Sequence, residues 1–367
     1  MREASRTAAL QRCLGILAVA LAAPRAAAAQ AASAAPEPFV RVEAAIAAAM
    51  SADNIPGLSI AVVLDGKLQW SRGYGFADLE NFVPFRPDTV WRLASVSKPL
   101  TAVAAMQLAE KGRLDLEAPI EKSCPAFPKK AQPITTRQLL GHLSGIRHYA
   151  KGENFNSTRH YESIAQALEA FAEDPLLQEP GTKNTYSTYG YVVLGCVVEG
   201  ASGERFAEYL RKNVTGPAGM DRTRTDDLYD IVPNRARGYA RLPDGKLRNA
   251  DLADTSNKIP GGGLVSTAED LGRFAIALFD GKILKPETFA AMQVPMKTSD
   301  GRDSFYFGWS IDEYRGDKLL THSGSQQGTR TYFLMVPRRR FAIAILTNTE
   351  DAGLKELSRK ALEILLP

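Results

Sequence analysis

The sequence is poor in the side chains that usually bind metals. Its 367 residues include only three cysteines and four histidines. The histidines, at positions 142, 148, 160 and 322, form no H-E-x-x-H or similar ligand spacing. We therefore expect neither a metal site nor a cofactor.

Apolar runs long enough to cross a membrane are also missing. The longest candidate, CLGILAVALAA at 13–23, is too short for a permanent anchor. It follows Arg2, Arg6 and Arg12 and precedes the small-residue stretch RAAAAQAASAAPEP. This order is typical of a secretory signal peptide, with cleavage expected near Ala29 and residues 30–38 as a linker. We expect an exported mature chain without a membrane span, periplasmic if the source is a Gram-negative bacterium.

Little net charge remains once this segment is removed. The whole chain carries a formal charge of +4, and residues 1–29 contain four arginines and one glutamate. Subtracting their +3 leaves about +1 on the mature chain. No basic stripe is visible, so we expect no nucleic-acid partner. With 45% hydrophobic residues the chain can bury a large core.

Two cysteines follow the signal segment, Cys124 and Cys196. An exported protein could join them in a disulfide. Cys196, however, lies in the apolar segment YVVLGCVVEG, where a buried thiol is the simpler interpretation. We therefore favour a free thiol at Cys196, and the sequence leaves open whether the two cysteines pair.

Strand patterns gather at the two ends of the chain. GLSIAVVL and KLQWSRGYG flank Asp65-Gly66, a pair typical of a tight β-hairpin turn. Near the C-terminus, strands are expected in FGWSIDEY, KLLTHSG, GTRTYFLMV and RFAIAILTN, the last two separated by a turn at 337–339. Helices are expected at 39–53 and 267–280, where Thr267 is a plausible N-cap, and in ELSRKALEILL.

Between these ends the chain is rich in loops and helices. Helical segments are expected in TTRQLLGHLSG, ESIAQALEAFAED, TYGYVVLGCVVEGASG and ERFAEYLRKNV. The pattern predicts an α+β fold, with an antiparallel sheet flanked by helices and a helical insertion. We assign residues 39–111 and 256–367 to a discontinuous α/β domain, and residues 112–255 to a mainly helical domain.

One helix start carries a candidate nucleophile. The pattern from Val96 to Lys111 is helical, and Pro99 is tolerated only in a first turn. Ser95 therefore lies at the helix N-terminus, and Lys98 follows on the same face. A serine hydroxyl needs a neighbouring base, and a lysine of lowered pKa can serve. Alone, such an S-x-x-K pattern is expected about once by chance in a chain this long, and Ser95 could simply cap the helix.

Two further segments carry polar side chains beside apolar elements. Tyr186, in TYSTYGYVVLG, precedes a strongly apolar helix and could relay a proton, or could be an interfacial core tyrosine. His322 ends a strand in LLTHSGSQQGTR, where Gly324 lets the backbone approach a ligand. A solvated histidine at a strand end is the alternative there.

In this order the segments resemble the serine β-lactamase and penicillin-recognising enzyme family, especially class C β-lactamases and related esterases and D-amino-acid peptidases. SVSK at 95–98 matches S-x-x-K, YST at 186–188 stands in place of Y-x-N, and HSG at 322–324 in place of K-T-G. Accessory segments, ITTRQLLGHLSGI, IPGGGLVSTAEDLGRFA and FGW, are also similar. The resemblance runs from about residue 40 to the C-terminus.

The resemblance implies roles for individual residues. Ser95 would be acylated, with Lys98 as its base partner and Tyr186 as a proton relay. The backbone N–H groups of Ser95 and Ser325 would form the oxyanion hole. Substrate would contact the remaining matched positions, Thr188, His322, Ser323 and Gly324. We expect His142 and the glycines of GGGLV to be structural.

Two departures from the family pattern bear on substrate. Thr188 replaces the asparagine of Y-x-N and can form fewer hydrogen bonds. His322 replaces the K-T-G lysine, which helps bind a substrate carboxylate, and it is expected to be neutral at pH 7. This argues against efficient β-lactam hydrolysis and favours small esters, amides or peptides that lack this carboxylate, unless Arg330 supplies a replacement charge.

We therefore expect an exported serine hydrolase of the esterase or D-amino-acid peptidase type. A β-lactamase, or a non-catalytic binding protein on the same fold, is the alternative. An α/β-hydrolase is excluded because G-x-S-x-G is absent. The sequence leaves the oligomeric state open.

Overall fold

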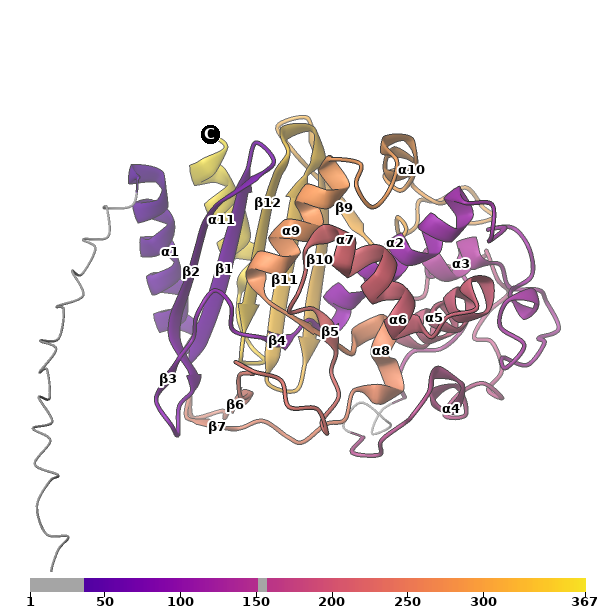
Figure 1. Cartoon of the computed structure of the whole chain (residues 1–367), viewed down its shortest axis with the longest axis horizontal. Helices are drawn as coiled ribbons and strands as arrows, with labels where there is room; N and C mark the ends of the chain where they lie inside the picture. Colours follow the sequence, from indigo (N-terminus) through magenta and orange to yellow (C-terminus); the bar gives the residue numbers. More distant parts are fainter. Residues whose placement is uncertain (1–35, 151–156) are drawn as a thin grey trace, which may run out of the picture. The chain divides into compact units, whose positions relative to one another are not determined.

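A seven-stranded antiparallel sheet forms the centre of the protein, in the strand order β3-β2-β1-β12-β11-β10-β9 (Figure 1). The computed structural model describes residues 36–150 and 157–367, and Glu37–Pro367 form one compact unit. The strands come from both ends of the chain, as predicted: β1 (Gly57–Leu64), β2 (Lys67–Asp78), β3 (Val83–Pro84), β9 (Ser310–Tyr314), β10 (Asp317–Gln326), β11 (Thr329–Val336) and β12 (Phe341–Thr347).

The hairpin turns follow the predicted turn residues. Asp65 and Gly66 have φ angles of 51° and 74°, the left-handed pair that a tight turn between twisted strands requires. At the other hairpin, Pro337–Arg339 form a short 3-10 turn between β11 and β12. Strands β1 and β12 pair directly, with Ile60 opposite Ile345, which joins the two ends of the chain in one sheet.

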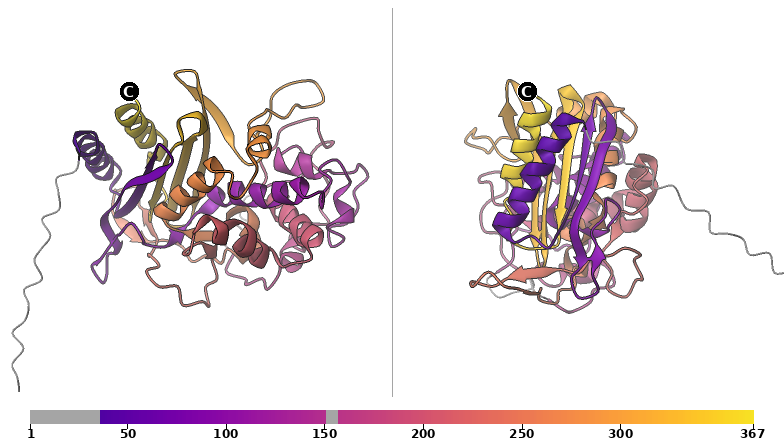
Figure 2. Two further views of the ribbon diagram at one scale, coloured as in Figure 1. Left: turned by 45° about the horizontal axis from the view of Figure 1, so that its top comes forward. Right: turned by 90° about the vertical axis from the view of Figure 1, so that its left-hand side faces the viewer.

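Helices cover both faces of this sheet. Helices α1 (Glu37–Asp53) and α11 (Leu354–Leu365) lie side by side on one face (Figure 2). Helix α9 (Ala268–Phe279) packs on the other face against β1 and β12. Its predicted N-cap is confirmed, because the Thr267 hydroxyl accepts a hydrogen bond from the Asp270 N–H at 3.0 Å. With both faces covered, β12 is buried along its whole length.

The remaining helices lie beside the sheet. Helix α2 (Ser97–Glu110) is buried almost all round and packs against α5 and α8. The other helices are α3 (Thr136–Leu140), α4 (Ile164–Leu168), α5 (Thr188–Ser202), α6 (Phe206–Leu210), α7 (Gly216–Ala218), α8 (Ile259–Gly262) and α10 (Pro286–Ala291). Short strands connect them: β4 (Trp91–Arg92), β5 (Arg224–Thr225), β6 (Tyr239–Arg241), β7 (Leu247–Asn249) and β8 (Leu264–Ser266). The predicted α+β class is confirmed, whereas the division into two domains stays a prediction.

Several elements are shorter than the sequence pattern suggested. Helix α3 begins with a capping box between Thr135 and Gln138, but it ends before Gly141, where His142 takes a left-handed φ of 55°. Strand β9 begins only at Ser310, because Phe307 and Gly308 also have positive φ angles. Left-handed residues cannot continue either element.

The favoured interpretation, a buried free thiol at Cys196, is wrong. Cys124 and Cys196 form a disulfide that links the segment after the 3-10 turn Ile120–Lys122 to the middle of α5. The apolar setting of Cys196 suggested a free thiol, yet both partners are buried, so a buried disulfide fits the same pattern. Because 72 residues separate the two cysteines, local sequence gives no sign of the pairing.

Two expectations concern membranes and export. Within residues 36–150 and 157–367, no helix combines the length and apolar character needed to cross a membrane. The predicted signal peptide at 1–29 lies outside the described residues.

Candidate active site

Ser95 lies in a 3-10 turn, Ala94–Val96, that leads directly into α2. The preceding residue, Ala94, has a φ of 47°, a left-handed conformation that costs free energy for a residue with a Cβ atom. Ser97 holds this turn: its hydroxyl donates to the Ala94 carbonyl at 2.7 Å and accepts from the Leu264 N–H at 3.3 Å. No side chain caps α2, so the alternative role of Ser95 as a helix cap is not observed.

Lys98 lies one helical turn after Ser95, and its side chain is fully buried. Its Nζ atom is 3.1 Å from Ser95 Oγ, 3.1 Å from Thr188 Oγ1 and 2.6 Å from the Gly261 carbonyl oxygen. Burial, and the charge of Lys258, hold the Lys98 pKa well below its usual value. A lysine with such a pKa can accept the proton of a serine hydroxyl.

Tyr186 completes a cluster of three interacting side chains. Its hydroxyl is hydrogen-bonded to the side chains of Ser95 and Thr188, and its ring centroid lies 4.8 Å from Lys98 Nζ. Burial raises the Tyr186 pKa to about 12, so the hydroxyl keeps its proton at neutral pH. A protonated hydroxyl next to the nucleophile can donate a proton to a leaving group.

Two histidines hold the start of α5, which carries Thr188. The Nδ1 atom of His142 accepts from the Ser187 N–H at 3.1 Å, and Nδ1 of His148 accepts from the Thr188 N–H at 3.1 Å. These amides precede the first helical hydrogen bonds and need other acceptors. Burial lowers both histidine pKa values, that of His148 to about 4, so both rings are neutral and can accept. The structural role expected of His142 therefore takes the form of a hydrogen bond at the site.

Strand β10 passes close to the 3-10 turn Ala94–Val96, which carries Ser95. His322 is buried, and burial together with the charge of Lys98 lowers its pKa to about 3. It is therefore neutral, and its Nδ1 donates to the Ser323 carbonyl at 2.7 Å. A side chain at Gly324 would place a Cβ atom 2.4 Å from the Leu93 carbonyl oxygen, so only glycine allows this approach. The Ser323 side chain is exposed.

The register of β10 determines where the Ser325 N–H points. Gln326 pairs with Thr329 across a two-residue turn, and such a closing pair exchanges both of its backbone hydrogen bonds. Alternation then directs the N–H of the preceding residue, Ser325, away from β11. Pairing with β9 ends at Thr321, so this N–H faces the edge of the sheet that runs past Ser95.

A small pocket of about 280 Å³ opens at Ser95. It brings together three of the predicted site residues, Ser95, Thr188 and Ser325, with residues that the sequence did not single out. The lining residues are Ala94, Ser95, His148, Tyr149, Thr188, Lys258, Gly261, Gly262, Ser325 and Gln326. Tyr149 hydrogen-bonds Thr188, and burial lowers the Lys258 pKa to about 7. In the sequence, His148 and Tyr149 are marked only by following the segment LLGHLSG, and Lys258 only by preceding IPGGG.

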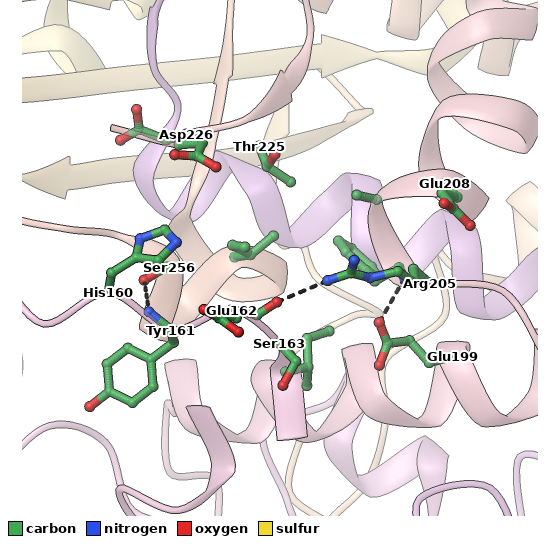
Figure 3. A pocket seen from close by; sticks show the side chains of 15 residues that line it. His160, Tyr161, Glu162, Ser163, Glu199, Arg205, Glu208, Thr225, Asp226 and Ser256 are labelled. Carbon is green, nitrogen blue, oxygen red and sulfur yellow. Dashed lines mark hydrogen bonds between the residues drawn. The ribbon is translucent and has the colours of Figure 1, made fainter. Parts of the chain in front are cut away.

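A larger pocket, of about 830 Å³, lies on the segment just before α8 and contains none of the catalytic candidates (Figure 3). Ser256 accepts there from the Tyr161 N–H at 2.9 Å, and Arg205 donates to the Glu162 carbonyl at 2.9 Å. These contacts hold the segments of the fold together. Size alone therefore does not identify the candidate active site, and the contact between Ser95 and Lys98 directs attention to the smaller pocket.

The arrangement at Ser95 is suited to acyl transfer. It combines a serine hydroxyl, a buried amine of lowered pKa, a protonated tyrosine hydroxyl and a Ser325 N–H that faces away from β11, the kinds of group that acyl transfer uses. Among the described residues no group of three or more His, Cys, Asp or Glu side chains could hold a metal ion.

Comparison with known proteins agrees with this arrangement. Residues 42–366 match the family described as Beta-lactamase, and the chain belongs to this family. The human "Serine beta-lactamase-like protein LACTB, mitochondrial" (Homo sapiens) is 30% identical over 413 residues, covering 83% of this chain and 75% of that protein. The predicted family resemblance is confirmed.

Solved structures with the same fold include enzymes. D-amino acid amidase from Ochrobactrum anthropi SV3 superposes with a TM-score of 0.77 at 25% identity, over 89% of this chain and 99% of that one. EstCE1, described as a hydrolase with promiscuous acyltransferase activity, superposes with a TM-score of 0.73 at 26% identity, over 89% and 97% of the two chains. This chain therefore has the β-lactamase fold of serine hydrolases that include an amidase.

Proposed function

We propose that this protein is an exported serine hydrolase that forms an acyl-enzyme on Ser95. Its substrates are small esters, amides or peptides, of the kind that esterases and D-amino-acid peptidases cleave. The observation that carries the proposal is the position of Lys98: fully buried, of lowered pKa, and 3.1 Å from Ser95 Oγ. A non-catalytic binding protein would have no need of this costly buried amine.

Acylation follows from the contacts in the site. Ser95 Oγ attacks the substrate carbonyl carbon as its proton passes to the neutral amine of Lys98. The carbonyl oxygen becomes an oxyanion that receives the N–H groups of Ser95 and Ser325. When the tetrahedral intermediate collapses, the Tyr186 hydroxyl gives its proton to the leaving oxygen or nitrogen, and Lys98 returns a proton to Tyr186.

Deacylation reverses these transfers with water in place of the leaving group. Water adds to the acyl carbonyl and loses a proton through Tyr186, and Ser95 Oγ leaves and regains its own proton. The products are a carboxylic acid and the free enzyme, and no cofactor enters the balance.

Thr188 provides the shared contact in this relay. Its hydroxyl lies 3.1 Å from Lys98 Nζ and is also hydrogen-bonded to Tyr186. Threonine therefore performs the lysine-orienting part of the role that asparagine has in the family pattern. The neutral His322 supplies no cation for a β-lactam carboxylate, which makes β-lactamase activity the weaker alternative.

Export is supported by two features at different places in the chain. The N-terminal segment has the order of a signal peptide. Disulfides such as Cys124–Cys196 persist in oxidising compartments rather than in the cytosol.

A three-substrate panel tests the proposal. The protein lacking residues 1–29 is incubated with a short-chain p-nitrophenyl ester, nitrocefin and a D-alanyl-D-alanine peptide. We expect turnover of the ester or the peptide, and the mass of an acyl adduct on Ser95. Absence of turnover and of any adduct with acylating probes would contradict the enzyme proposal, and a fully active Ser95→Ala protein would contradict the site.

A further inference from the structure

The end of strand β10 places a glutamine at the pocket that opens at Ser95. Gln326 is the last residue of β10, and it lines this pocket together with Ser95. Only 3% of its surface is exposed. The sequence motifs did not single it out, because the matched segment HSG ends two residues before it.

The alternation of side chains along β10 decides which way Gln326 points. Positions 322, 324 and 326 are buried, whereas the two serines between them are exposed, so the three buried positions share one face of the strand. A Cβ atom at Gly324 would lie 3.2 Å from the Ser95 nitrogen, so this face looks toward the 3-10 turn that carries Ser95. The Gln326 carboxamide therefore projects from the side of β10 that faces Ser95.

The amide nitrogen of Gln326 is buried and has no hydrogen-bond partner among the described residues. Two other polar groups of the pocket wall differ in this respect. The Thr188 hydroxyl oxygen lies 3.1 Å from Lys98 Nζ, and His148 Nδ1 accepts from the Thr188 N–H. A buried donor without an acceptor costs free energy, which an acceptor on a bound molecule would offset.

We propose that the Gln326 carboxamide donates a hydrogen bond to a carbonyl oxygen on the acyl side of the substrate. The preferred acyl groups then carry a second carbonyl near the reacting one, as peptides do. The inference rests on the proposed acyl-enzyme function and names its substrate class. Because the acyl group stays bonded to Ser95 after the leaving group departs, a donor in the same pocket can hold it during both acylation and deacylation. A carbonyl oxygen suits this donor because it only accepts hydrogen bonds.

Two matched esters test this. p-Nitrophenyl 4-oxopentanoate carries a second carbonyl, whereas p-nitrophenyl pentanoate has the same acyl chain length without it. We expect the ratio of their kcat/KM values to favour the 4-oxopentanoate ester. Gln326→Met removes the donor at similar side-chain length and should reduce this preference about three- to thirtyfold, the effect of losing one neutral hydrogen bond. Gln69→Met makes the same exchange at an exposed position of β2 and should leave the preference unchanged.

Stability separates a substrate-binding role of Gln326 from a structural one. A buried donor without a partner does not stabilise the fold, so the urea midpoint of Gln326→Met should equal or exceed that of the wild type. A lower midpoint, together with equal losses of kcat/KM on the two esters, would show that the carboxamide supports the fold and would overturn the proposal.

Binding to a protein that cannot form the acyl-enzyme separates this inference from the proposed function. Calorimetry on Ser95→Ala should show tighter binding of the 4-oxopentanoate ester than of the pentanoate ester, and Ser95→Ala/Gln326→Met should lose this difference. If the pentanoate ester is turned over and Ser95 is labelled by a neutral fluorophosphonate, but the preference is equal in wild type and Gln326→Met, the Gln326 contact is wrong and the hydrolase stands. If neither ester is turned over and Ser95 is not labelled, the hydrolase proposal fails, and the difference in Kd between the two esters on Ser95→Ala still decides the role of Gln326.

Discussion

The side-chain nitrogen of Lys98 lies 2.6 Å from the carbonyl oxygen of Gly261. A carbonyl oxygen can only accept, so this contact fixes one N–H of the amine and leaves the rest of the nitrogen for Ser95 and Thr188. Helix α8 is held against α2 at the same point, because the Thr101 hydroxyl donates to the Pro260 carbonyl at 2.6 Å. The glycine segment, expected to be structural, therefore positions the Lys98 amine.

Replacing Gly261 by alanine should reduce activity. The added methyl group would lie 2.7 Å from Thr188 Cγ2 and 2.9 Å from the Thr188 carbonyl oxygen, which is backbone and cannot move alone. Helix α8 must shift, and the Lys98 contact shifts with it. We expect kcat of a p-nitrophenyl ester to fall at least tenfold, with a loss of about 1–3 kcal/mol of unfolding free energy from overpacking.

Gly262→Ala is the matched control for this change. It adds the same atom one residue later, where the nearest atoms lie 3.8 Å away, an ordinary contact distance. Its kcat and its unfolding midpoint in urea should stay close to those of the wild type. If kcat falls equally in the two variants, alanine anywhere in α8 disturbs activity, and the specific role of Gly261 in positioning Lys98 is contradicted.

The pH dependence should reveal the state of Lys98. In the proposed mechanism the neutral amine is the base, so kcat/KM for a neutral ester should be low in acid, rise as pH increases through the Lys98 pKa and then level off. Burial and the Lys258 charge place this rise well below the usual lysine pKa of 10.5. His148 and His322, with pKa values of about 4 and 3, stay neutral across the rise, and Tyr186, at about 12, titrates above it.

Lys258→Met should move this acid limb to higher pH. Removing a positive neighbour makes protonation of Lys98 easier, which raises its pKa. The other groups near Lys258 bear on its charge but are unchanged by the substitution; they are Arg92, Asp226, Asp254, His148 and Tyr149. Lys318→Met, at an exposed lysine that donates to the Gln293 carbonyl, is the control and should leave the profile unaltered. Superimposable profiles for wild type and Lys258→Met would contradict the coupling.

Local chemistry made the framework predictable. Asp65-Gly66 specified a hairpin, because both residues adopt left-handed angles readily. Pro99 limited where α2 could begin and so placed Ser95 at its first turn. The three motif segments then indicated which elements meet, because S-x-x-K, Y-x-N and K-T-G have fixed places in the family fold.

The rest of the site depends on contacts between distant segments. In the sequence, Lys258 is an ordinary polar residue before a glycine-rich segment. The packing of α8 against α2 brings it to the pocket. His148 and Tyr149 lie in a loop without periodicity, and their roles arise from hydrogen bonds with Thr188, 40 residues away in the case of His148. Ala94 gave no sign of its left-handed conformation, because glycine is the residue that usually marks one.

The Cys124–Cys196 disulfide should stabilise the fold without taking part in the reaction. It closes a segment of 72 residues, for which chain entropy predicts a contribution of up to about 4 kcal/mol to the free energy of unfolding. Tyr186 and Thr188 lie at the N-terminal end of α5, whereas Cys196 lies in its middle. The hydrogen bonds described for Tyr186 and Thr188 do not involve either cysteine. Cys124→Ala/Cys196→Ala should therefore unfold at lower urea concentration and keep most of its kcat. Alanine suits both buried positions because it leaves no polar atom there.

Reductant supplies the control for this last prediction. Dithiothreitol should lower the urea midpoint of the wild type toward that of the double variant, and it should not change the midpoint of the double variant, which has no bond to reduce. The prediction fails if dithiothreitol leaves the urea midpoint of the wild type unchanged although mass spectrometry shows two free thiols. The disulfide would then add nothing to stability. In that case α5 would be held by its apolar packing alone, in which Val192, Val193 and Val197 are completely buried.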